Sequence, residues 1–81
     1  MSPEVSFGKA VKAARHEVGL SQEALAYEAG IHRTYISDIE RGRRNPSLTT
    51  MIRIAEALEQ PVAALVSFHV LGEQRSTQRE T

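Results

Sequence analysis

The sequence contains no cysteine and no tryptophan among its 81 residues, and its aromatic side chains are limited to two phenylalanines and two tyrosines. Without cysteine, neither a disulfide framework nor a thiolate metal site can form, which suits a reducing compartment. No apolar run approaches the length that a bilayer span needs, and the N-terminus lacks the basic-then-apolar order of a signal peptide. We therefore expect a single small domain that is soluble and cytoplasmic.

The chain also lacks a net charge, because ten basic and ten acidic side chains cancel. A domain that binds nucleic acid is usually basic, so the total by itself argues against one. The distribution reverses that argument. Residues 31–53 hold five arginines against Asp38 and Glu40, whereas residues 54–81 hold four glutamates against two arginines. The neutral total thus conceals a basic region that can attract a polyanion.

The most informative stretch, residues 19–46, begins with a short helical pattern. Ser21 is a good N-cap because its hydroxyl can accept a bond from a free main-chain N–H group of the first turn. Gly30 can adopt the left-handed conformation that ends a helix. Between them, apolar residues recur at three- and four-residue spacing: Leu25, Ala26 and Ala29. This pattern predicts a helix of about two turns, followed at once by a tight turn.

A second short helix follows that turn. His32 stands at its cap position, and Ile31, Ile36 and Ile39 point to one side. The opposite face carries polar side chains: Arg33, Thr34, Ser37, Asp38 and Arg41. A short helix with a buried isoleucine seam and a hydrogen-bonding outer face suits the major groove of duplex DNA, where base edges are read from the helix's N-terminal half.

Two further helices are predicted on either side of this stretch. The first is capped by Ser6, ends at Gly19 and buries four residues at helical spacing: Phe7, Val11, Ala14 and Val18. The other is capped by Ser47 and carries the strongest apolar periodicity of the chain: Leu48, Met51, Ile52, Ala55 and Leu58. We expect this second helix to supply much of the core.

The last apolar segment, residues 62–71, fits two structures. The spacing of Val62, Leu65 and Val66 fits a helix, whereas alternation along residues 66–70 fits a half-buried strand; we favour a helix through about Ser67. Either way the segment is more apolar than one small core requires, which indicates a dimer interface. The residues assigned to it are Val66, Phe68, Val70 and Leu71. Residues 72–81 are polar and are predicted to form a disordered tail, so the domain spans residues 1–71.

The runs LSQEALA, AGIHRTYISDIERGRRNPSL and IAEAL resemble the Cro/CI-type (XRE) helix-turn-helix family of bacterial and phage regulators, over residues 6 to 66 or so. Within them, HRTYISDIERGRRNP is similar to restriction-modification controller proteins. The resemblance implies an all-α, five-helix, lambda-repressor-like fold whose helices 2 and 3 form the helix-turn-helix. The function it implies is a sequence-specific regulator of transcription that binds duplex DNA. We expect a homodimer on a near-palindromic operator.

We expect base contacts from Arg33, Thr34, Ser37 and Asp38, since arginine can bind guanine through two parallel hydrogen bonds and threonine can meet a base edge or a thymine methyl group. The arginine-rich loop after the second short helix is placed to contact phosphate. The candidate phosphate contacts are Gln22, Tyr35, Arg41, Arg43, Arg44, Asn45 and Ser47. The resemblance implies that Gln22 bonds a phosphate and also braces the recognition helix, although Gln22 could be no more than a good helix former. It also implies a structural pair between Arg15 and Glu40.

Four other assignments keep alternatives. Tyr35 and Asn45 could pack or turn the chain instead of reaching phosphate. Asp38 could accept from a cytosine amino group, restrain a neighbouring arginine, or repel phosphate and so penalise wrong sites. His32 replaces the serine or threonine common at this family position; imidazole is a poor cap, so His32 is either a further DNA contact or simply tolerated.

No enzyme activity, metal or cofactor is expected. The three histidines, His16, His32 and His69, lie on separate predicted elements without ligand spacing, and the carboxylates of residues 23–40 form no evident acid/base pair. Two other binding functions remain open, namely an antitoxin that uses its apolar tail on a toxin partner and a protein-interaction module on the same scaffold. RNA polymerase is a further candidate partner of a transcriptional regulator.

Overall fold

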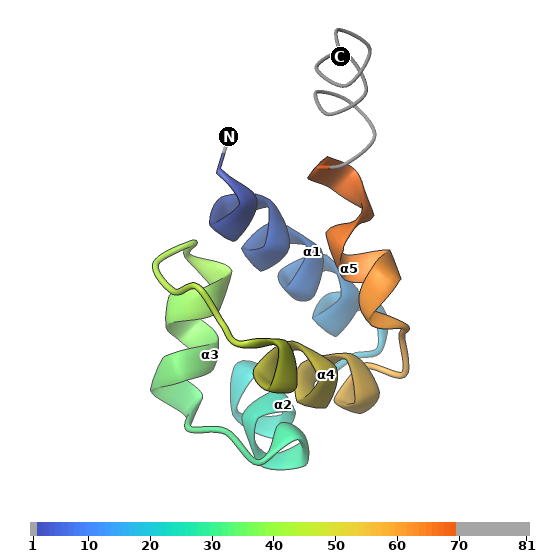
Figure 1. Ribbon diagram of the computed structural model, residues 1–81. Helices are drawn as coiled ribbons and strands as arrows, with labels where there is room; N and C mark the ends of the chain where they lie inside the picture. The colour runs from blue at the N-terminus through green and yellow to red at the C-terminus, as the bar shows by residue number, and fades with distance from the viewer. Residues whose placement is uncertain (1, 70–81) are drawn as a thin grey trace, which may run out of the picture.

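The computed structural model describes residues 2–69, and every regular element in this part of the chain is a helix (Figure 1). The helices are α1 (Pro3–Glu17), α2 (Gln22–Ala29), α3 (Arg33–Glu40), α4 (Leu48–Ala57) and α5 (Val62–His69). The prediction of an all-α, five-helix fold is therefore confirmed. Within these residues, no helix has both the length and the apolar character that a membrane crossing requires.

Serine side chains cap three of these helices. The hydroxyl oxygens of Ser2, Ser21 and Ser47 each accept a hydrogen bond from the main-chain N–H three residues later, at 3.0–3.1 Å, which satisfies one free donor of the first turn. The prediction that Ser6 caps α1 is wrong, because the helix begins one turn earlier. Pro3 occupies its first turn, where a fixed φ and a missing N–H carry no penalty.

Helix α1 lies between α3 and α5, while α2 and α4 pack together on the other side of the molecule (Figure 1). Each helix contributes apolar side chains to one shared core. The largest fully buried side chains are Val11, Leu25, Ile36, Ile39, Ile54 and Leu58. Two of these six come from α3, so the core holds this short helix from one side only.

The structure corrects the predicted core of α4. Leu48 and Ile52 are 62% and 40% exposed, whereas Ile54 is fully buried. The stripe that faces the core contains Met51, Ile54, Ala55 and Leu58, and the pair Leu48 and Ile52 lies one helical turn apart along its border. The sequence prediction counted Leu48 and Ile52 among the core residues, and it therefore assigned the inner face of α4 to the wrong side and missed Ile54.

The C-terminal segment is helical through His69, so the prediction of a helix is confirmed and the strand alternative is wrong up to that residue. Leu65 is buried, and Val66 is half-buried against the core of its own chain. Phe68 belongs to α5. The remaining two residues of the predicted dimer surface, Val70 and Leu71, and the predicted tail of residues 72–81 lie outside the described residues.

Candidate nucleic-acid interface

Helices α2 and α3 are joined by a tight turn over residues 30–32. Gly30 has φ 70° and ψ 36°, the left-handed conformation that glycine adopts without steric cost. The N–H of Ile31 then donates to the carbonyl oxygen of Ala26 at 2.9 Å, which closes the end of α2. Because Ile31 also packs against the core, the chain turns and enters α3 directly. Both features agree with the helix-turn-helix predicted from the sequence.

His32 caps α3, contrary to the expectation that imidazole would serve poorly. Its Nδ1 accepts a hydrogen bond from the main-chain N–H of Thr34 at 3.2 Å. An imidazole nitrogen can accept such a bond through its lone pair, as a serine hydroxyl oxygen does at the other helix starts. The side chain is exposed beside the first turn of α3.

The two faces of α3 differ sharply. Ile36 and Ile39 are fully buried, whereas Arg33 and Thr34 in the first turn are exposed and Ser37 and Asp38 are half-buried. A helix held by two buried isoleucines cannot rotate about its own axis without exposing them. The polar face is therefore fixed toward solvent, with Arg33 and Thr34 at the N-terminal end, from which a recognition helix reads bases.

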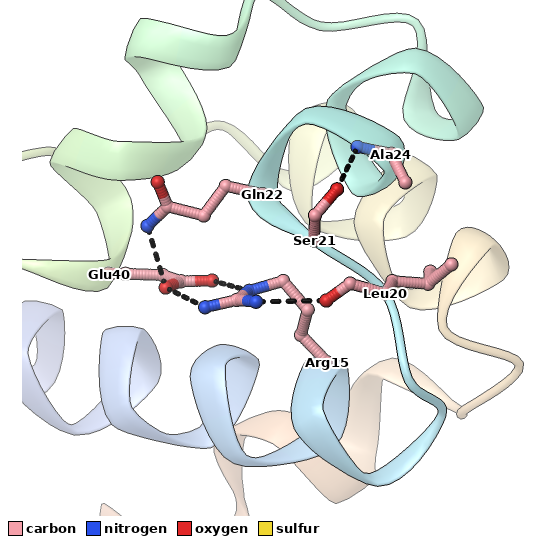
Figure 2. Close-up of polar contacts among 6 residues, drawn as sticks. All are labelled: Arg15, Leu20, Ser21, Gln22, Ala24 and Glu40. Atoms are coloured by element: carbon pink, nitrogen blue, oxygen red, sulfur yellow. Dashed lines mark hydrogen bonds and ion pairs between the residues drawn. The ribbon is translucent and has the colours of Figure 1, made fainter.

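The end of α3 is held by a buried ion pair with α1, shown in Figure 2. Arg15 Nε donates to Glu40 Oε2 at 2.7 Å and Arg15 Nη2 donates to Glu40 Oε1 at 3.0 Å, a bidentate arrangement. Arg15 Nη1 donates to the carbonyl oxygen of Leu20 at 2.9 Å, just before α2. The pair expected from the resemblance is thus present. Its side chains are only 9% and 3% exposed, so the pair is largely shielded from solvent.

Gln22 joins the same cluster from α2. Its Nε2 donates to Glu40 Oε1 at 3.0 Å, so one carboxylate links α1, α2 and α3 (Figure 2). This bond uses one N–H of the Gln22 amide, and the amide oxygen takes no part in it. Gln22 therefore braces the recognition helix directly, which is one of the two roles expected from the resemblance.

Burial raises the pKa of the Glu40 carboxyl, but hydrogen bonds from Arg15 and Gln22 and the charges of Arg15 and Lys12 outweigh it and hold that pKa below its ordinary value. The hydrogen bond to Glu40 raises the pKa of the Arg15 guanidinium. Both groups are therefore ionised at neutral pH, and the cluster carries no net charge from this pair. Its effect is to position the end of α3 relative to α1 and α2.

The loop after α3 presents cations beside the polar face. Arg41, Arg43, Arg44 and Asn45 are all exposed, and the following Pro46 is buried. The loop starts from Gly42, which has φ 76°, and the N–H of Arg43 returns to the carbonyl oxygen of Asp38 at 2.9 Å. Ser47, also predicted to contact phosphate, uses its hydroxyl to cap α4 and to donate to Thr50 Oγ1 at 3.1 Å.

Three side chains meet on the outer side of α3. Arg44 Nε lies 3.5 Å from Asp38 Oδ2, and the guanidinium carbon of Arg44 lies 4.8 Å from the centre of the Tyr35 ring. Among the alternatives for Asp38, the structure shows restraint of a neighbouring arginine. The Tyr35–Arg44 contact was not predicted. The i, i+3 spacing of Tyr35 and Asp38 was the available signal, because it places both on one face of α3.

Gly8 has a packing role that was not predicted from the sequence. A Cβ at this position would overlap the carbonyl oxygen of Ile39 and press on the carbonyl group of Glu40. Glycine in the middle of a helix lowers helical propensity, so an isolated glycine in a helical pattern often marks a close backbone contact. Gly8 thus lets α1 pack directly against the end of α3.

The helices described above are also the part of the chain that is similar to known proteins. The helix-turn-helix family model HTH_3 matches residues 11–65. The chain is 46% identical over 67 residues to control protein C.BamHI of Bacillus amyloliquefaciens, covering 82% of this chain and 83% of the relative. It is 46% identical over 57 residues to control protein C.SmaI of Serratia marcescens, covering 70% and 68%.

The fold is similar to a solved structure, the restriction-modification controller protein C.AhdI from Aeromonas hydrophila. The TM-score is 0.75 with 40% sequence identity, and the match covers 76% of this chain and 94% of that one. Helices α2, α3 and α4 and the Arg15–Glu40 cluster lie within the span that the family model matches, and α1 and α5 overlap its two ends.

Proposed function

Because the chain belongs to the HTH_3 helix-turn-helix family and is a transcriptional regulator of that kind, we propose that α3 enters the major groove of duplex DNA. Arg33 and Thr34 then meet base edges, and Ser37 and Asp38 lie one turn further along the same face. One observation carries this proposal. The exposed Arg33 and Thr34 stand on a helix whose opposite face is held by two fully buried isoleucines.

Phosphate contacts are proposed on both sides of that helix. Arg41, Arg43, Arg44 and Asn45 form an exposed group directly after α3, where the strand bordering the groove would pass. Gln22 stands at the N-terminus of α2, where free N–H groups favour an anion. His32 stands at the N-terminus of α3. Tyr35 and Ser47 remain in the proposed set, although both have intramolecular roles here.

We propose a homodimer that pairs through the C-terminal segment containing Phe68, Val70 and Leu71, with Val66 at its edge. Two-fold symmetry would then place two α3 helices about one duplex turn apart, so the operator should be a near-palindrome. A dimer also doubles the phosphate contacts, which matters for a chain whose formal net charge is zero.

The biological role that fits best is control of a restriction-modification system in the cytoplasm. Two relatives are named control proteins, and one structure of similar fold is a restriction-modification controller. This role predicts that genes for a DNA methyltransferase and an endonuclease lie next to the gene for this chain. In this proposal the chain binds DNA and carries out no chemical reaction.

The decisive experiment measures affinity for duplex DNA as a function of salt. Operator sequences are first selected from random duplexes with the wild-type protein, and a scrambled duplex of equal length serves as the control. We expect selection of a near-palindrome, and we expect log affinity to fall linearly with log salt concentration, by about 0.9 per phosphate neutralised. A chain that enriches no sequence and binds no duplex at low salt would exclude the proposed function.

A further inference from the structure

The loop arginines after α3 are not equivalent. Arg43 and Arg44 are adjacent and both exposed, but the side chain of Arg44 is placed on two residues of α3. Tyr35 lies under its guanidinium, and the Asp38 carboxylate lies against its Nε edge. These contacts occupy one face and one edge of the planar group. The terminal Nη edge of this side chain, which is 54% exposed, remains for another anion.

The platform under Arg44 is itself fixed. Tyr35 is half-buried and packs against the core, so its ring is held in place from below. The Asp38 side chain is 25% exposed, and its main-chain carbonyl accepts the N–H of Arg43 at 2.9 Å. The chain leading to Arg44 and the side chain of Arg44 are therefore both attached to α3. A cation held in this way moves with the recognition helix.

We infer that Asp38 and Tyr35 are positioning residues that make the phosphate contact of Arg44 depend on correct docking of α3. This inference rests on the proposed function. An arginine with a free side chain can find a phosphate on any duplex, so it adds affinity without sequence preference. A guanidinium fixed relative to Arg33 and Thr34 meets its phosphate only where those residues also meet their bases.

Asp38 thereby contributes to sequence discrimination without touching a base. Its negative charge holds Arg44 on the helix, so Arg44 adds little affinity on a sequence where α3 is not docked in register. Binding to wrong sequences is thereby weakened relative to the operator. Arg43, which immediately precedes Arg44 and is also exposed, provides a matched cation for comparison.

The test is a double-mutant cycle with two duplexes, the selected operator and its scrambled control. The measured quantity is the ratio of the two affinities for wild type, Asp38→Asn, Arg44→Gln and the double variant. Asp38→Asn should lower the ratio about two- to fivefold, which is the size expected for the loss of one exposed ion pair. In the Arg44→Gln background, Asp38→Asn should leave the ratio unchanged. In the Arg43→Gln background it should have its full effect.

Tyr35→Phe keeps the ring under Arg44; loss of the hydroxyl as a phosphate contact would lower both affinities alike, so the ratio should stay at the wild-type value. Tyr35→Leu should lower the ratio as Asp38→Asn does. Circular dichroism checks that each variant is folded. An Asp38→Asn effect of equal size with and without Arg44 would overturn the inference and assign Asp38 a direct role at DNA. An equal gain in affinity of Asp38→Asn for both duplexes would also overturn the inference, because it would show only that the Asp38 charge repels phosphate. If the wild-type protein prefers the operator but the cycle shows no coupling between Asp38 and Arg44, the proposed function stands and only this inference is rejected.

Discussion

Gly8 of α1 lies directly against the carbonyl oxygen of Ile39 in α3, at a separation that leaves no room for a side-chain carbon. The backbone contact sits next to the Arg15–Glu40 pair, which also joins α1 to the end of α3. Helix α3 is thus located by two independent contacts with α1, one steric and one electrostatic.

Gly8→Ala should destabilise the fold by about 1–3 kcal/mol, because the added methyl group forces α1 and α3 apart. Its effect is opposite to the usual gain from replacing a helical glycine by alanine. Thermal and urea unfolding measure the change. Ala13, on the exposed side of α1, offers the control: Ala13→Gly removes a methyl group from solvent and should cost only the helical propensity, about 1 kcal/mol. A Gly8→Ala protein as stable as wild type would contradict the contact.

Acidification should remove the contribution of Glu40 to stability. The pKa of Glu40 is lower in the folded protein than its ordinary value of 4.5, so the folded state binds its proton less readily than the unfolded state. The stabilisation is fully present above pH 4.5 or so and is lost as pH falls through the lower folded pKa. Unfolding free energies of wild type and Glu40→Gln, measured from pH 7 to pH 3, should converge at the acid end. Parallel curves would show that Glu40 has no depressed pKa.

Arg33→Ala should weaken operator binding by about 1–3 kcal/mol and relax sequence preference at one base pair of each half-site. The reason is the loss of a bidentate base contact, which the scrambled duplex never makes. Binding to scrambled DNA should therefore change much less. Arg53→Ala is the matched control, because it removes another exposed arginine side chain, this one on α4. If Arg33→Ala reduces affinity equally for both duplexes, Arg33 contacts phosphate and not a base.

Phe68→Glu should produce folded monomers with weakened operator binding, because a charge would be placed in the proposed dimer surface. Sedimentation measures the association state, and circular dichroism checks the fold. Ser67→Glu adds the same charge at the preceding, exposed residue and should leave the dimer intact. An unchanged dimer in the Phe68→Glu protein would remove the C-terminal segment as the interface.

The sequence predicted those parts of the fold that depend on local rules. Ser21 and Gly30 mark the ends of α2 through cap and turn chemistry, and Ile36 and Ile39 mark the inner face of α3 through periodicity. The prediction that Ile52 faces the core of α4 was wrong, and Ile54 is buried instead. Both residues fit an apolar stripe, and only the packing of the neighbouring helices decides how the helix is rotated.

The contacts between elements were harder to predict. The pairing of Arg44 with Asp38 and Tyr35 depends on the path of an irregular loop, for which no periodic pattern exists. Gly8 acts through a backbone contact with a helix more than thirty residues away in sequence. The Arg15–Glu40 pair followed from the resemblance, but its burial and its third member, Gln22 as a donor to the same carboxylate, required the three-dimensional arrangement.

The carboxylate shared by Arg15 and Gln22 has a mechanical consequence for reading DNA. Since α1, α2 and α3 are joined at this carboxylate and share one core, we expect the three helices to move as one unit. Two copies that had to span half-sites of unequal separation would therefore adapt by tilting one whole unit against the other, or by bending the DNA between them.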